Sequence, residues 1–142
     1  MKMKKMFFMV LLMLLFVPST APAADFAWMP DFNLQAQADP SGFRARIATR
    51  FNIGDAQITT VLSNFPQPAD AYVALRLGEM SGKPIDVVTT RYQESKGMGW
   101  GKLAKSLGIK PGSREFHALK RGDDLYGGKD KKQGKGKGKK NK

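Results

Sequence analysis

The chain of 142 residues contains no cysteine and a single histidine, His117. Without cysteine there is no disulfide, no thiolate nucleophile and no thiolate metal ligand, so stability has to come from packing. A metal site needs three or four convergent ligands, and the sequence around His117 offers only Glu115. We therefore predict no catalytic, cofactor or metal site and a protein that is not an enzyme. Ser–Lys and carboxylate-pair chemistry are the enzyme classes that composition alone leaves open.

The middle of the chain has little net charge. The formal net charge is +12, yet residues 25–126 contain thirteen basic and eleven acidic residues, a net charge of +2. The excess lies at the two ends, with three lysines in residues 1–24 and eight lysines against one aspartate in residues 127–142. The overall basicity therefore says little about a binding face on the central part.

Long apolar runs are missing after residue 17. Before it, Met1–Lys5 is basic, Met6–Val17 is an apolar run of twelve residues, and Ala21–Ala23 has the spacing of a cleavage site. This order predicts a signal peptide over 1–23 and an exported protein, periplasmic or secreted. An uncleaved membrane anchor is disfavoured, because twelve helical residues span about 18 Å against a hydrocarbon core of roughly 30 Å.

The segment after the signal has no sustained hydrophobic period. Residues 24–40 mix aromatic residues with prolines, which predicts an irregular lead-in. Residues 43–51 fit both a strand and a helix, since Phe43, Ile47 and Phe51 also stand four residues apart. We expect a helix, because a lone strand would lack a partner. Its arginines are an anion-binding candidate, against the simpler interpretation of a solvated face: Arg44, Arg46 and Arg50.

Downstream, apolar residues recur at helical spacing, and Pro66, Gly82, Gly97 and Gly108 interrupt the pattern. Prolines and glycines at such places start and end helices. The loops between the expected helices are short, which favours compact packing of neighbours. We predict an all-α domain over 41–126, a compact bundle of about five or six short helices.

The stretch from Lys96 to Lys120 is the densest in structural signals. Trp100, Leu103 and Leu107 share one helical face, Gly108 suits a left-handed helix end, and Ser113 can cap a second short helix. We expect Trp100 to be buried, so that Trp100→Ala would unfold the domain by removing roughly 3–5 kcal/mol.

The sequence of this stretch resembles that of an uncharacterised family of small exported bacterial proteins, whose recurrent motif is KGxGWGxxAKxLGIKPGSxEFHALK. The resemblance covers roughly Asp55 to Tyr126 and includes the preceding PADAYVALRLGEMSGKP. It implies a helical domain in a Gram-negative, periplasmic setting. It implies no activity.

Residues 99–121 also permit an alternative function. Ala104 and Gly108 stand where the first helix and turn of a helix-turn-helix would place them. A nucleic-acid-binding protein would then present Arg114, His117, Lys120 and Arg121 to the groove. The export signal, the longer connection and the small charge of the domain all weaken this interpretation.

The final segment, 127–142, has no apolar residue and alternates lysine with glycine. Such a composition predicts a disordered tail. Its cationic residues are the candidate polyanion-binding set: Lys129, Lys131, Lys132, Lys135, Lys137, Lys139, Lys140 and Lys142. Outside the cytoplasm their partners would be lipopolysaccharide, phospholipid headgroups or extracellular nucleic acid. A solubility tail without a partner is the alternative. The leading hypothesis is a non-enzymatic exported helical module that interacts with the cell envelope.

Overall fold

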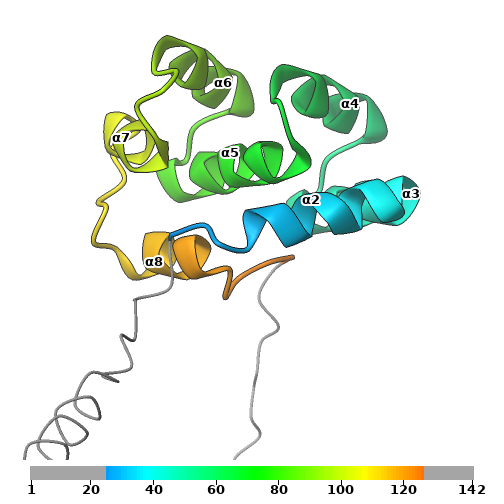
Figure 1. The fold of residues 1–142 in the computed structure, drawn as a ribbon. Helices are drawn as coiled ribbons and strands as arrows, with labels where there is room; N and C mark the ends of the chain where they lie inside the picture. Colours follow the sequence, from blue (N-terminus) through cyan, green and yellow to red (C-terminus); the bar gives the residue numbers. More distant parts are fainter. Residues whose placement is uncertain (1–24, 127–142) are drawn as a thin grey trace, which may run out of the picture.

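The computed structural model describes residues 25–126, and this part of the chain is entirely helical (Figure 1). Its seven helices are α2 (Met29–Ala38), α3 (Pro40–Phe51), α4 (Asp55–Asn64), α5 (Pro68–Ser81), α6 (Ile85–Glu94), α7 (Trp100–Ser106) and α8 (Arg114–Arg121). The predicted all-α bundle is therefore confirmed for the described part. The signal peptide predicted over 1–23 and the tail predicted over 127–142 lie outside it.

Helix α5 occupies the centre of the bundle. In Figure 1, α4 and α6 lie on one side of it and α2 and α8 on the other, and α5 contacts all four. Its sequence lacks a polar stripe over most of its length, which is typical of a buried helix. The core residues that it contributes are Ala69, Ala71, Tyr72, Val73, Ala74, Leu75, Leu77 and Gly78.

The prediction of an irregular lead-in over 24–40 is wrong for most of that segment, because residues 29–38 form helix α2. Pro30 lies in the first turn, where its missing N–H costs nothing. Only Phe32 and Ala36 are buried, so the hydrophobic period is too sparse to recognise in the sequence. The helix is held by tertiary packing, and the Asn33 side chain accepts a hydrogen bond from the Ala69 N–H at the start of α5, at 2.8 Å.

The ambiguous segment 43–51 is helical, as expected, and belongs to α3. The helix begins at Pro40 rather than near Ser41, because the Asp39 side chain accepts a hydrogen bond from the Gly42 N–H and caps the first turn, at 2.9 Å. Phe43 and Ile47 are buried, as the helical spacing predicted.

The corner between α7 and α8 follows its sequence signals closely. Gly108 has a φ of +85°, and the Ile109 N–H donates to the Ala104 carbonyl at 2.9 Å, which completes a Schellman motif. The Ser113 hydroxyl accepts a hydrogen bond from the Phe116 N–H and caps α8. The sequence therefore determines this corner locally.

The segment before α2 is fastened to the end of α8. The Phe26 N–H donates to the Lys120 carbonyl, and the Trp28 indole N–H donates to the Leu119 carbonyl, both at 2.8 Å. Gly122 has a φ of +77° and its Cα lies so close to the Trp28 ring that an added Cβ would approach it to 2.8 Å. Glycine is required there by both the backbone conformation and the close contact.

Tyr72 ties α5 to the last described residues. Its ring is fully buried, and its hydroxyl donates to the Asp124 carbonyl at 3.2 Å and accepts from the Tyr126 N–H at 2.8 Å. Arg76, one turn further along α5, pairs with the Asp124 carboxylate and with Glu79. Two polar side chains of α5, Tyr72 and Arg76, thus hold the segment 124–126.

We expect Tyr72→Phe to lower the free energy of unfolding by about 1–3 kcal/mol, because it leaves the Asp124 carbonyl and the Tyr126 N–H without their partner. Burial raises the pKa of the Tyr72 hydroxyl to about 12. The stabilisation from the protonated hydroxyl is complete below the unfolded pKa of about 10 and is lost as the pH rises through about 12.

Urea titrations from pH 8 to 12 should therefore show wild type losing stability relative to Tyr72→Phe between pH 10 and 12. Tyr126→Phe is the matched control at pH 8, because it removes a hydroxyl of the same kind and leaves the Tyr126 N–H that donates to Tyr72 in place. Equal stability of wild type and Tyr72→Phe at pH 8 would contradict the assignment.

Candidate functional site

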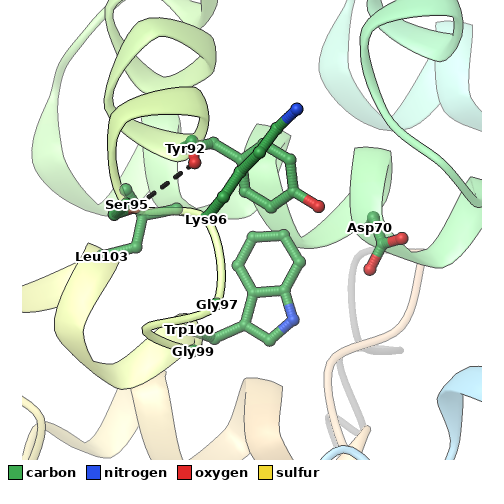
Figure 2. Close-up of a pocket in the computed structure, with 8 residues that line it drawn as sticks. All are labelled: Asp70, Tyr92, Ser95, Lys96, Gly97, Gly99, Trp100 and Leu103. Atoms are coloured by element: carbon green, nitrogen blue, oxygen red, sulfur yellow. Dashed lines mark hydrogen bonds between the residues drawn. The ribbon is translucent and has the colours of Figure 1, made fainter.

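A pocket of about 310 Å³ opens where the first turn of α5 faces the end of α6 and the start of α7 (Figure 2). Six of the residues that line it carry the argument below: Asp70, Tyr92, Lys96, Gly97, Gly99 and Trp100. Three helices and one loop therefore contribute to a single concave surface.

Two stacked rings form one wall of the pocket. The rings of Tyr92 and Trp100 lie 5.3 Å apart at an angle of 22°. Phe65 packs against Tyr92 at 4.9 Å, and Phe26 lies 6.4 Å from Trp100. The stack is supported at both ends, so its position is fixed by the core.

The loop between α6 and α7 forms the rim. Gly97 and Gly99 have φ values of +83° and +82°, a left-handed conformation that favours glycine. Between them, the Met98 N–H donates to the Ser95 carbonyl at 2.9 Å and closes a turn. Helix α7 starts directly after Gly99, so this loop determines where the Trp100 ring lies.

Three polar groups from different elements converge on the pocket. Figure 2 shows the Tyr92 hydroxyl and the Trp100 indole nitrogen directed toward the side on which the Asp70 carboxylate lies. Neither the Tyr92 hydroxyl nor the Trp100 indole N–H forms a hydrogen bond to any other described residue, whereas the Gln67 backbone N–H bonds to Asp70. The pocket therefore offers one charged acceptor, one donor and one hydroxyl that does both.

The protein environment changes the acidity of two of these groups. Burial raises the pKa of Asp70, and the Gln67 N–H opposes the rise only in part. Burial also raises the pKa of Tyr92, and the nearby charge of Asp70 adds to the effect. Asp70 is thus a partly buried carboxylate that forms no ion pair among the described residues, and groups with shifted pKa values of this kind are frequent at functional sites.

No protein-family model, curated protein or solved structure matches this chain. The resemblance to a family of small exported bacterial proteins stays a prediction. The site has to be interpreted from its own chemistry.

Sequence reasoning did not find the pocket, and it predicted a core position for Trp100. The pairing of Asp70 with residues more than twenty positions away depends on how α5 packs against α6. Only the cluster of Gly97, Gly99 and Trp100 was a local signal for an unusual loop.

The arginines of α3 are committed to contacts within the fold. Arg44 pairs with Asp55 at 2.6 Å, and Arg50 pairs with Glu79 at 2.8 Å. The Arg46 guanidinium lies over the Tyr126 ring, 5.1 Å from its centre. These contacts favour the structural role over the anion-binding candidate.

The helix-turn-helix alternative has a weak structural basis. The main packing partner of α7 is α6 and that of α8 is α5, so the two helices are not packed chiefly against each other. Lys120 pairs with Asp25 at 3.4 Å, and Arg121 pairs with Asp123 at 2.8 Å. Arg114 and His117 are exposed. Half of the proposed groove-facing set is therefore engaged in ion pairs.

Two further features are absent from residues 25–126. This part of the chain has no group of three or more histidine, aspartate or glutamate residues arranged to hold a metal ion. It also has no helix that is long and apolar enough to cross a membrane. The eight candidate lysines of the tail lie outside this range.

The surface carries a basic segment that the net charge of residues 25–126 does not reveal. Residues 96–114 contain five basic residues and no acidic one, and all five are exposed: Lys96, Lys102, Lys105, Lys110 and Arg114. None of them forms an ion pair within the described part of the chain. The near-neutral net charge of 25–126 conceals this asymmetry, which a count over shorter windows would have shown.

The Trp100 ring is only partly buried beside the pocket, so the loss of roughly 3–5 kcal/mol expected for a buried ring is too large. We expect Trp100→Ala to leave the domain folded, with a loss of about 2–3 kcal/mol. Leu103→Ala, at a position that is 1% exposed, should cost about as much or more. Urea denaturation followed by circular dichroism measures both. An unfolded Trp100→Ala protein would restore the original expectation.

Asp70 should make the stability of the protein depend on pH. Because the folded-state pKa is raised, the protonated carboxyl favours folding, and that stabilisation is lost as the pH rises through the folded pKa. We therefore expect the stability of Asp70→Asn to rise relative to wild type between pH 3 and pH 7. Asp86→Asn, at an exposed position near the start of α6, is the control. A relative change in the opposite direction would exclude the environment described for Asp70.

Proposed function

We propose that the protein is an exported, non-enzymatic helical module that binds anionic lipid surfaces through its basic C-terminal third. The observation that carries the proposal is the segment 96–114, with five exposed basic residues, no acidic residue and no internal ion pair. Exposed lysines of this kind attract the phosphates of lipopolysaccharide and phospholipid headgroups, each contributing about 1 kcal/mol.

The charges in the rest of the domain indicate that the basic surface is confined to residues 96–114. Five other basic residues pair with acidic residues of the domain: Arg44, Arg50, Arg76, Lys120 and Arg121. Outside 96–114, residues 25–126 carry eight basic and eleven acidic residues. A polyanion would therefore meet attraction at one segment and repulsion over much of the remaining surface.

An exposed apolar residue favours a lipid surface over nucleic acid. Met98 is 57% exposed and stands in the loop between Lys96 and Lys102. An apolar tip flanked by lysines suits an interface where hydrocarbon lies beneath phosphate groups.

The export signal and the tail add to the same proposal from the sequence. The pattern over 1–23 predicts export from the cytoplasm. An exported protein can reach lipopolysaccharide and the anionic headgroups of the cell envelope. The tail adds eight lysines to the charge of segment 96–114. Together they give a binding region whose affinity should fall steeply with salt.

Flotation of the full-length mature protein with vesicles of phosphatidylglycerol and phosphatidylcholine tests the proposal. We expect binding that disappears when phosphatidylglycerol is omitted or when salt is raised to 1 M, where the screening length is about 3 Å. Neutralising Lys102, Lys105 and Lys110 to glutamine should weaken binding on the order of 100-fold. Adding Met98→Ser to this triple variant should weaken vesicle binding further without changing its salt dependence.

A matched pair of single substitutions separates the segment from general charge. Lys105→Gln should weaken vesicle binding about fivefold, whereas Lys83→Gln, an exposed lysine outside the segment, should leave it unchanged. If Lys105→Gln and Lys83→Gln weakened vesicle binding equally, binding would depend on the net charge of the protein and not on the segment 96–114. Tight binding of duplex DNA with no vesicle binding at the same salt would exclude the lipid proposal and favour the nucleic-acid alternative.

A further inference from the structure

The pocket beside Asp70 imposes a specific hydrogen-bonding requirement on any ligand. The Trp100 indole N–H only donates, the Asp70 carboxylate in its ionised form only accepts, and the Tyr92 hydroxyl does both. All three residues line the same pocket. The Trp100 N–H and the Tyr92 hydroxyl form no hydrogen bond with any other described residue. A ligand that fits must therefore both donate and accept hydrogen bonds.

This requirement excludes several ligand classes. An ammonium group would bind Asp70 but would leave the Trp100 N–H without an acceptor. A phosphate or carboxylate would be repelled by Asp70. An apolar ligand would cover the Trp100 N–H and the Tyr92 hydroxyl without giving either a hydrogen-bond partner. Alcohol hydroxyls suit all three groups, because each donates one hydrogen bond and accepts others, and unlike an amide it does so through one atom.

The other walls of the pocket agree with this choice. The stacked rings of Tyr92 and Trp100 provide an apolar surface for C–H groups next to the polar atoms. In Figure 2 the Lys96 amine lies above the Tyr92 ring, at the rim of the pocket, and it forms no ion pair with Asp70. The volume of about 310 Å³ is at the lower end of the range of about 300–1,000 Å³ for small-molecule sites.

We infer that the pocket is a carbohydrate site that takes one neutral sugar residue. Adjacent hydroxyls of the sugar accept from Trp100 Nε1–H, donate to the Asp70 carboxylate and exchange a hydrogen bond with the Tyr92 hydroxyl. The carbon-bound hydrogens of the ring contact the aromatic wall. This activity goes beyond the proposed binding of lipid surfaces and uses different residues, so either can fail without the other.

The two tryptophans of the chain make the test internally controlled. The Trp28 indole N–H is already bonded to the Leu119 carbonyl, whereas the Trp100 indole N–H opens into the pocket. In a proton–nitrogen correlation spectrum of the full-length mature protein, the two indole signals are assigned with Trp100→Phe. We expect titration with glucose or N-acetylglucosamine to shift the Trp100 signal in a saturable way and to leave the Trp28 signal in place.

Tyr92→Phe removes one hydroxyl and keeps the ring stack, so sugar affinity should fall roughly two- to tenfold. Tyr126→Phe removes a hydroxyl elsewhere in the fold and should not change the affinity. The inference is overturned if neither sugar shifts the Trp100 signal at 200 mM (on the order of the weakest sites worth naming), or if Trp28 and Trp100 shift equally. A saturable response to choline or inorganic phosphate in place of the sugars also overturns it.

Discussion

The complete burial of Tyr72 is the constraint on which the described structure depends. Its hydroxyl cannot be left unpaired in the core, and the only partners that it finds are the backbone groups of Asp124 and Tyr126. The C-terminal end of the domain must therefore return to α5. Once it does, α8 is held against α5, and residues 26–28 close over α8 through the Trp28 indole.

The pocket is a consequence of this arrangement. With α5 fixed at the centre, α6 and α7 pack on the side opposite α2 and α8, and their aromatic residues stack over the first turn of α5. Asp70 stands at that turn, where the positive end of the helix favours a carboxylate even though burial opposes its ionisation. A carboxylate kept at this cost, next to unused donors, distinguishes the pocket from a packing defect.

The glycine-rich loop connects the two proposed binding regions. Ser95, Lys96, Gly97 and Gly99 line the pocket, and the basic segment begins in the same loop with Lys96 and the exposed Met98. A surface carrying sugars and phosphates close together would engage both regions at once. The loop conformation requires positive φ at Gly97 and Gly99, so its shape is encoded in the backbone rather than in side-chain contacts.

The sequence alone determined the all-α class and the α7–α8 corner, because prolines, glycines and capping residues act within one helical turn. It failed for α2, whose two buried residues leave almost no period and whose stability comes from packing on α5. Only the tertiary structure decided that Trp100 borders a pocket and that Asp70 faces it. Burial and convergence depend on partners from distant elements, and no local pattern specifies those partners.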